Sequence, residues 1–320
     1  MAFEIKNPLI LILGPTCTGK TSLAEKLCSK YTGEIISADS RQIYRYMDVG
    51  TGKVSLLKKS GSVSCKTHLQ DVVTPNQHYS VSDWSKAAQN IANYLWATGK
   101  TPFVVGGTGF YIDVLLGNRQ LSGVEPDYKL REELEKLSLG ELFERLENED
   151  SERAENIDRK NKRRLVRALE VVNSKSVSNT NLNSVSMKKS TILILGLTAS
   201  NEFLYQRADS WVESILEDNA LLDETADLIS RGYKNNEPLQ GIIYKTVVEY
   251  LENSLSYGDM KQRIKWDIHA YIRRQLTWFK KSPKGINWFD ISKPDHFEKV
   301  ENSVKYYLGI TNNKVQSSKK

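Results

Sequence analysis

The sequence predicts an α/β fold, in which a parallel β-sheet is flanked by helices and an all-helical domain is inserted into the chain. Short continuous apolar runs alternate with segments whose apolar residues recur at helical spacing, as in parallel sheets that are covered on both faces. A long central segment is dense in charge and contains no strand candidate. A glycine-rich turn joins the first apolar run to the first helical segment.

The first strand is expected at residues 9–13, a wholly apolar run between Pro8 and Gly14. This run is too short to cross a membrane, and no signal-peptide cleavage pattern follows it, so we expect no membrane association. Further strands are predicted where short apolar runs recur, at residues 34–38, 102–105 and 191–197. Amphipathic helices are predicted at residues 21–30 and 82–98.

The central segment predicts a division of the chain into two domains. Residues 1–117 and 191–311 form the expected catalytic core, in which residues 201–281 are again helical in pattern. Residues 118–190 form the helical insertion, which is helical from 128 to 172 and ends in a Ser/Asn/Lys-rich loop. A polar, basic tail at residues 312–320 is expected to be disordered.

Composition sets broad limits on the class of protein. A chain of 320 residues can form one large domain or two moderate ones. The net charge of +6 favours a polyanionic partner, although a surplus of lysine for solubility explains it equally well. Three cysteines without CxxC spacing predict reduced thiols in a cytoplasmic protein, and the four histidines show no zinc-ligand spacing.

The turn after the first strand matches G-x-x-x-x-G-K-[ST] in full, and it leads into a helix as that phosphate-binding motif requires. Its backbone N–H groups are expected to hold phosphate oxygens, with a lysine as a point charge and a threonine hydroxyl on Mg²⁺. A chance glycine-rich turn is the alternative. The predicted diphosphate site comprises Gly14, Pro15, Thr16, Cys17, Thr18, Gly19, Lys20 and Thr21, with Thr21 as the Mg²⁺ ligand.

The motif alone does not say whose phosphates are bound. An ATPase of this type needs a carboxylate at the end of another strand to position Mg²⁺. The strand at residues 102–105 ends instead in Gly106-Gly107-Thr108, which counts against ATP hydrolysis and permits another diphosphate.

Asp39 follows the second predicted strand and is the candidate general base. Ligands of open parallel sheets collect at the carboxyl ends of the strands, which places Asp39 near the phosphate loop. A carboxylate there can accept a proton from a nucleophile or help to bind Mg²⁺. The alternative is a loop cap, because Asp is common where a strand ends.

Taken together, these blocks resemble the tRNA dimethylallyltransferase (tRNA isopentenyltransferase) family, in its bacterial form, over most of the chain. The phosphate loop resembles GPTxxGKT, and ISADSRQIY at residues 36–44 resembles the block that follows the family's second strand. The more specific blocks stand in the family's order: DVGTGK at 48–53, HLQD at 68–71, YSVSD at 79–83, GGTGFY at 106–111, RRLVRALEV at 163–171 and RRQLTWF at 273–279.

This resemblance implies a P-loop NTPase-like core, Mg²⁺ and a helical insertion that binds tRNA. It implies transfer of a dimethylallyl group from dimethylallyl diphosphate to N6 of the adenosine immediately 3′ of the anticodon. It assigns catalysis to Asp39, Thr108 and Lys20, and it adds Lys245 to the diphosphate site. By the same resemblance the tRNA anticodon stem-loop contacts Asp39, Ser40, Arg41, Gln42, Thr108, Arg131, Arg163, Arg164, Arg167 and Arg274. We expect a monomer.

Each assignment has a structural alternative. The charged helix around Arg163 is also typical of a solvated surface, and Trp278 and Phe279 are also typical of a core. Thr108 is also suited to cap the helix that follows it. Four positions depart from the family pattern, namely Ile243 in place of Gly, Trp211 and His269 in place of Arg, and Arg159 near the usual Pro.

Three other functions remain open at this stage. An adenylate isopentenyltransferase would use the same chemistry on a free nucleotide. A small-molecule P-loop kinase would also place an Asp after its second strand. A non-enzymatic RNA-binding protein would keep the phosphate loop in a site that has lost its catalytic activity. The helical insertion and the RRQLTWF block favour tRNA as the acceptor.

Overall fold

A computed structural model of the chain describes residues 7–53, 65–119, 121–174, 192–281 and 284–309. These residues form two compact units: the described residues up to Arg119 together with those from Ile192 onward, and residues 121–174. The predicted tail at residues 312–320 and most of the predicted loop at 173–190 lie outside the described residues. None of the described helices is both long and apolar enough to span a membrane.

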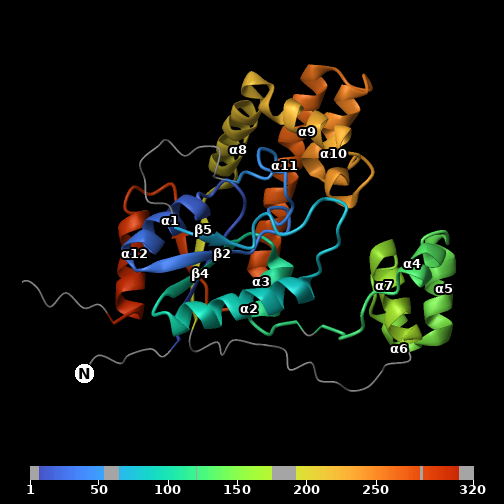
Figure 1. The fold of residues 1–320 in the computed structure, drawn as a ribbon, viewed down its shortest axis with the longest axis horizontal. Coiled ribbons are helices and arrows are strands. Elements are labelled where there is room, and N and C mark those ends of the chain that lie inside the picture. The colour runs from blue at the N-terminus through green and yellow to red at the C-terminus, as the bar shows by residue number, and fades with distance from the viewer. Residues whose placement is uncertain (1–6, 54–64, 120, 175–191, 282–283, 310–320) are drawn as a thin grey trace, which may run out of the picture. The chain divides into compact units, whose positions relative to one another are not determined.

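The first unit is built on a six-stranded sheet, in which all the pairings are parallel and the strand order is β3-β2-β4-β1-β5-β6 (Figure 1). The strands are β1 (Leu9–Leu13), β2 (Gly33–Ser37), β3 (Thr67–His68), β4 (Thr101–Gly106), β5 (Ile192–Thr198) and β6 (Asn287–Asp290). The predicted α/β class with a parallel sheet is confirmed. The two edge strands, β3 and β6, are too short to give a periodic signal in the sequence, which is why they were not predicted.

Both faces of the sheet are covered, as continuous apolar strands require. Alternate residues of β1 point to opposite faces, so Ile10 and Ile12 pack with α1 (Lys20–Lys30) and α12 (His296–Tyr307). Leu9, Leu11 and Leu13 pack with α2 (Val81–Ala97) and α3 (Gly109–Leu115). The central strand is therefore fully buried, and the loop that follows it is held in one place.

A group of C-terminal helices completes the first unit and packs beside the carboxyl ends of the strands (Figure 1). It comprises α8 (Asn201–Leu216), η3 (Glu217–Asn219), α9 (Ala220–Ser230), η4 (Glu237–Gln240), α10 (Ile242–Leu251) and α11 (Tyr257–Lys281). Ile43 and Met47, from the segment after β2, are buried in the same cluster. This packing brings the segment after β2 against helices that lie far along the chain.

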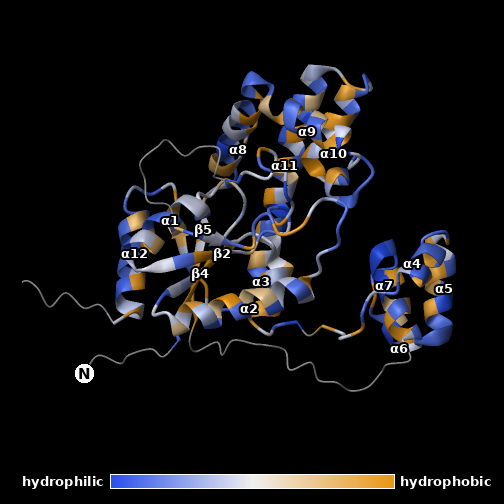
Figure 2. Cartoon of the chain, viewed as in Figure 1, coloured by the Kyte–Doolittle hydropathy of each residue, from blue (hydrophilic) through white to orange (hydrophobic). Residues whose placement is uncertain are grey.

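The second unit is wholly helical in its described part, with α4 (Tyr128–Leu134), α5 (Leu139–Glu149), α6 (Ser151–Glu155) and α7 (Lys162–Asn173). Apolar and polar residues alternate around α5 and α7 (Figure 2), and the apolar residues of the four helices form a separate core around Leu134, Leu142 and Leu165. Ser138 forms a capping box with Glu141, and the Asn161 side chain accepts a hydrogen bond from the Arg164 N–H. These caps set where α5 and α7 begin.

One expectation about cysteine is wrong. Cys28, on α1, and Cys65, just before β3, form a disulfide, whereas the sequence predicted three reduced thiols. Cys17 is the free cysteine among the described residues. Spacing along the chain did not reveal the pair, because the parallel pairing of β2 with β3 is what brings Cys65 next to the end of α1.

Candidate active site

The phosphate loop lies between β1 and α1, as predicted. Gly14 has φ +149°, and a Cβ there would stand 2.4 Å from the Leu197 carbonyl oxygen. Gly19 has φ +80° and occupies the N-cap of α1, where no side chain caps the helix. The first turn of α1 contains no acidic residue either. Its N–H groups and the helix dipole therefore favour an anion at this end.

Lys20 begins α1, and its Nζ donates a hydrogen bond to the Pro15 carbonyl oxygen at 2.7 Å. Burial lowers the pKa of Lys20 to about 8, against an opposing effect of the nearby Asp39 carboxylate. Thr18 is buried, and its hydroxyl donates to the same carbonyl at 2.8 Å. Lys20 and Thr21 line the pocket described below, whereas Thr18 braces the loop from within.

Two side chains from the C-terminal helices hold the phosphate loop, and motif analysis did not identify either. Gln275, on α11, accepts a hydrogen bond from the Thr16 N–H at 2.8 Å and donates one to the Gly107 carbonyl oxygen at 3.1 Å. Arg207, on α8, donates from Nε to the Cys17 carbonyl oxygen at 2.7 Å. A long-range contact of this kind has no local sequence signal, although Gln275 does lie in the RRQLTWF block.

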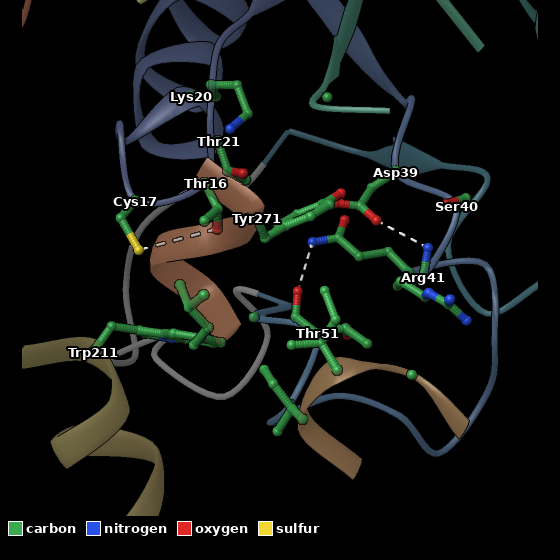
Figure 3. A pocket seen from close by; sticks show the side chains of 18 of the residues that line it. Thr16, Cys17, Lys20, Thr21, Asp39, Ser40, Arg41, Thr51, Trp211 and Tyr271 are labelled. Carbon is green, nitrogen blue, oxygen red and sulfur yellow. Dashed lines mark hydrogen bonds between the residues drawn. The ribbon is translucent and has the colours of Figure 1, made fainter. Parts of the chain in front are cut away.

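Asp39 lies in the turn just after β2, at the edge of the sheet that carries the phosphate loop (Figure 3). Its Oδ1 accepts a hydrogen bond from the Arg41 N–H at 2.9 Å. Asp39 can therefore cap its loop and also act as a general base, because the hydrogen bond from the Arg41 N–H uses only one of the two carboxylate oxygens. Tyr271, on α11, lines the same pocket and lies beside Asp39 (Figure 3). Burial raises the pKa of Tyr271, and the nearby Asp39 charge adds to this effect.

Thr108 stands at the N-cap position of α3, but its side chain makes no capping hydrogen bond. Its Oγ1 instead accepts a hydrogen bond from the Ser40 N–H at 3.0 Å and lies 3.3 Å from the Ser40 hydroxyl. The structure thus brings together the predicted residues Thr108, Asp39 and Ser40, which come from two strand ends. The alternative of a helix cap is confirmed for the position of Thr108 but not for its side chain, which binds Ser40 instead of the first turn of α3.

Gln42 is held by three hydrogen bonds that together orient its side-chain amide. Its Oε1 accepts from the Ser37 hydroxyl at 3.2 Å and from Gln70 Nε2 at 2.8 Å. Its Nε2 donates to the Thr51 carbonyl oxygen at 3.2 Å. The fixed amide lines the same pocket as Asp39.

The phosphate loop and residues 39–42 line one pocket of about 550 Å³, whereas Thr108 and Gln275 support it from outside its lining (Figure 3). The lining also includes a set of apolar side chains and rings, those of Trp211, Ile243, Ile268 and Tyr271. An anion site, a carboxylate and an apolar wall therefore share one cavity, which suits a substrate that joins a diphosphate to a hydrocarbon.

Several predicted residues lie outside this pocket. Lys245, on α10, is exposed, and its Nζ lies 4.0 Å from Glu249 Oε1. Arg274 is exposed and lies with its guanidinium 5.7 Å from the centre of the Tyr271 ring. Neither is among the residues that line the cavity. Their assigned roles stay predictions.

The predicted arginines of the insertion fall into two groups. Arg131 and Arg167 contact the buried Glu170 carboxylate, at 2.8 and 3.2 Å, and the Asp127 N–H donates to the same carboxylate at 3.1 Å. Arg163 and Arg164 are exposed at the start of α7. The first group ties α4 to α7, whereas the second group lies at the surface of the insertion.

Two of the four departures from the family pattern face the pocket, because Trp211 and Ile243 both line it. A Cβ at Gly52 would stand 3.6 Å from the Trp211 ring, so the indole lies along the loop that contains Gly52. The His269 ring stacks on Tyr205 at 4.1 Å and lies 2.8 Å from Asp209 Oδ1. Arg159, in the insertion, lies 3.9 Å from the centre of the Phe143 ring.

Among the described residues, no group of three or more His, Cys, Asp or Glu side chains is arranged to hold a metal ion. A divalent cation in this pocket would therefore depend on the Thr21 hydroxyl, the Asp39 carboxylate and oxygens of the substrate. Mg²⁺ is commonly bound in this way, with few protein ligands and with phosphate and water oxygens completing its shell.

Comparison with known proteins agrees with this geometry. The family model "IPP transferase" matches residues 42–282, and the model "Isopentenyl transferase" matches residues 7–61. The chain is 34% identical to a tRNA dimethylallyltransferase of Caldanaerobacter subterraneus over 310 residues, which are 94% of this chain and 97% of the relative. It is 35% identical to that of Acetivibrio thermocellus over 308 residues, again 94% of this chain and 97% of the relative.

Solved structures extend the comparison to the fold. The tRNA isopentenylpyrophosphate transferase of Bacillus halodurans superimposes with a TM-score of 0.69 at 30% identity, covering 95% of this chain and 97% of that one. A eukaryotic dimethylallyltransferase that acts on tRNA gives a TM-score of 0.76 at 25% identity, covering 97% and 81%. The IPP transferase model covers more than half of the chain, including Gln42, Thr108 and the helices from α8 to α11, and the first-named relatives match over nearly their whole length. The chain therefore belongs to the IPP transferase family, and it is a prenyl-transferring enzyme.

Proposed function

We propose that this enzyme transfers a dimethylallyl group from dimethylallyl diphosphate to N6 of the adenosine immediately 3′ of the anticodon in tRNA, releasing diphosphate. The observation that carries the proposal is the single pocket in which a phosphate loop, the Asp39 carboxylate and an apolar wall meet. The relatives named tRNA dimethylallyltransferase, which match the chain over nearly its full length, support the choice of substrates.

The donor's diphosphate binds at the phosphate loop. The uncapped first turn of α1 supplies N–H groups, while Lys20 and Arg207 supply positive charge beside them. As the allylic C–O bond breaks, the bonding electron pair leaves with the diphosphate oxygen, and these donors stabilise the growing negative charge. The Thr21 hydroxyl would hold Mg²⁺, which would supply further charge neutralisation beside the diphosphate when bound.

The acceptor adenine enters beside Asp39. Its N6 attacks the allylic carbon, a C–N bond forms, and Asp39 accepts the proton that N6 loses. General-base assistance of this kind contributes typically about 10²- to 10⁴-fold to the rate. Thr108 and Ser40 hold the turn that carries Asp39, and the oriented amide of Gln42 is placed to recognise a base edge.

An anticodon base must leave its stack to reach such a cavity, as in other enzymes that modify bases. The exposed cations of the insertion, Arg163 and Arg164, are suited to contact the RNA backbone. We propose a cytoplasmic monomer. The support for the compartment is the tRNA substrate, because the Cys28–Cys65 disulfide removes the sequence argument from reduced thiols.

The test is incubation of the protein with dimethylallyl diphosphate, Mg²⁺ and unmodified tRNA, followed by mass analysis of the nucleosides. We expect N6-dimethylallyladenosine from tRNA and from an anticodon stem-loop, with little product from AMP. Preferential modification of AMP would favour an adenylate isopentenyltransferase. Phosphoryl transfer from labelled ATP without the prenyl donor would favour a kinase, and tight tRNA binding without any product would favour a non-enzymatic binder.

A further inference from the structure

The loop at residues 48–53 lies beyond the segment that follows β2. Three of its residues, Gly50, Thr51 and Gly52, line the pocket. One carboxylate binds three of the loop's backbone N–H groups. Glu224, on α9, accepts hydrogen bonds from three consecutive N–H groups, those of Asp48 and Val49 at 2.6 Å and that of Gly50 at 3.0 Å. Three successive N–H groups that converge on one site are a common anion-binding arrangement of the backbone. Here the anion is a side chain of the same chain.

The same carboxylate also fixes the neighbouring helix. The Tyr244 hydroxyl, on α10, donates to Glu224 Oε1 at 2.7 Å. Tyr244 lies so close to the loop that a Cβ on Gly50 would stand 2.7 Å from its hydroxyl oxygen. Glu224 thus joins three segments, because the loop, α9 and α10 all meet at its two oxygens. Both Gly50 and Tyr244 line the pocket, whereas Glu224 does not.

The loop in turn fixes a side chain of the proposed acceptor site. The Thr51 carbonyl oxygen accepts the hydrogen bond from Gln42 Nε2. Two other groups donate to Gln42 Oε1, so the amide has its oxygen end and its nitrogen end assigned by separate partners. If the Thr51 carbonyl moves, the nitrogen end of the amide loses its acceptor.

A second anchor acts on the ends of the loop rather than on its middle. Lys53 is buried, and its Nζ donates to the Tyr44 carbonyl oxygen and contacts the Asp48 and Asp71 carboxylates, at 2.6, 2.8 and 2.6 Å. These contacts hold the loop to the protein but do not touch the backbone N–H groups of Val49 and Gly50. The loop is also braced from within, because the Thr51 hydroxyl donates to the Met47 carbonyl oxygen at 2.5 Å and the Gly52 N–H donates to the Val49 carbonyl oxygen at 3.1 Å. Glu224 is the side chain that ties the N–H groups of residues 48–50, and with them this braced loop, to α9.

We propose that Glu224 is a positioning residue for the acceptor adenosine. By binding the backbone of residues 48–50, Glu224 sets the position of the Thr51 carbonyl group, and that carbonyl group in turn orients the Gln42 amide. The proposal rests on the proposed function, in which Gln42 recognises the base. Glu224 touches neither substrate in this arrangement. Its effect is therefore expected on the use of tRNA rather than on the donor's diphosphate.

The test compares Glu224→Gln with Asp223→Asn, a matched control that removes the same charge at an exposed position one residue earlier on α9. A carboxamide offers one acceptor oxygen and turns an NH₂ group toward N–H donors, so it cannot keep all four hydrogen bonds. We expect Glu224→Gln to lower kcat/KM for tRNA about 100-fold, as a displacement of about 1 Å can. We expect a smaller loss in Glu224→Asp, and no change in Asp223→Asn or in KM for the donor.

A double-mutant cycle with Gln42→Ala separates positioning from general stability. If Glu224 acts through Gln42, adding Glu224→Gln to Gln42→Ala should cost less than about threefold, far below the product of the two single losses. All variants are assayed well below their measured unfolding temperatures. If Glu224→Gln does not fold, Tyr244→Phe replaces it, because this change removes one hydrogen-bond donor to the Glu224 carboxylate. Tyr244→Phe is then combined with Gln42→Ala in the same double-mutant cycle.

Two outcomes overturn the proposal. One is unchanged kcat/KM for tRNA in Glu224→Gln, and the other is a double variant whose losses simply multiply. The wild-type protein in the same assay keeps these outcomes distinct from failure of the proposed function. If the wild-type protein forms dimethylallyladenosine but the losses of the two single variants multiply in the double variant, only the positioning role is refuted. A wild type that forms none refutes both.

Discussion

At the scale of single residues, the chemistry of this site depends on what surrounds each charged group. Lys20 is a strong base in water, yet burial lowers its pKa to about 8. Asp39 uses one oxygen to hold its own turn and faces the pocket from the end of β2. These environments make two residue-level predictions, one for donor binding and one for proton transfer.

The pH dependence of donor use should follow the charge of Lys20. Its protonated form attracts the diphosphate, and a lowered pKa means that this form is lost as pH rises through about 8. We expect kcat/KM for dimethylallyl diphosphate to fall above that pH, because this ratio reports groups of the free enzyme. At saturating donor, kcat should keep its value to higher pH, because bound diphosphate stabilises the ammonium. A ratio that stays flat up to about pH 10, near the pKa of free lysine, would contradict the role of Lys20.

The isosteric change Asp39→Asn tests the general base. Asparagine can still accept the hydrogen bond from the Arg41 N–H, so the turn should keep its shape while the base is lost. We expect kcat to fall by about 10²- to 10⁴-fold with tRNA affinity nearly unchanged, measured by single-turnover kinetics and by equilibrium binding. Asp227→Asn, an exposed position paired with Arg231, is the matched control. Near-normal turnover in Asp39→Asn would show that another group takes the proton.

At the scale of elements, helices that lie far along the chain hold the loops that do the chemistry. α11 reaches the phosphate loop through Gln275, and α8 reaches it through Arg207. The insertion uses the same strategy internally, where the buried Glu170 carboxylate joins α4 to α7. In each case one polar side chain satisfies partners on a separate element, so its removal should affect that element as well as itself.

Removing the Gln275 side chain should weaken donor binding. The Thr16 N–H then loses its partner, and a buried unsatisfied group costs about 1–3 kcal/mol. We expect Gln275→Ala to raise KM for the donor about tenfold or more, since each 1.4 kcal/mol, roughly, is a factor of ten. Gln206→Ala, exposed on α8, serves as the control. An unchanged KM for dimethylallyl diphosphate would mean that the loop keeps its shape without this bond.

Removing the Glu170 carboxylate should destabilise the insertion. Arg131 and Arg167 then face each other without their shared partner, and a hydrogen bond to a charged group contributes about 1.5–3 kcal/mol. In Glu170→Ala we expect faster amide hydrogen exchange in residues 127–172, with the sheet unaffected. The exposed Glu147→Ala is the control. Equal exchange in the two variants would show that the arginines do not depend on Glu170.

At the scale of the whole molecule, the proposed chemistry and the proposed RNA contacts of the insertion lie in two separate compact units. The first unit contains the sheet, the pocket and the helices that support it. The second unit has its own core and presents Arg163 and Arg164 at the start of α7. The net charge of +6 suits a polyanionic substrate, and the proposed tRNA contacts use cations that the Glu170 carboxylate does not engage.

Reversing one exposed charge tests this proposed RNA surface. We expect Arg164→Glu to weaken tRNA binding and to reduce the slope of log affinity against log salt by about 1, because one phosphate contact is lost. Lys136→Glu, an exposed cation of the same unit, is the comparison, and we expect it to have a smaller effect. Identical tRNA affinity and salt slope in Arg164→Glu and the wild type would remove this residue from the interface.

The sequence by itself determined the features that local patterns encode. Apolar runs fixed the inner strands, the spacing of glycines and lysine fixed the phosphate loop, and Asp39 followed from its place at a strand end. Side-chain pairing between distant elements has no local pattern, so only the tertiary structure decided the roles of Gln275 and Glu224 and the pairing of Cys28 with Cys65. It also separated the arginines that bind Glu170 from those that are exposed. Local sequence sets conformational preference, whereas contacts across the fold decide which polar groups are satisfied, and for these residues that decision defines their function.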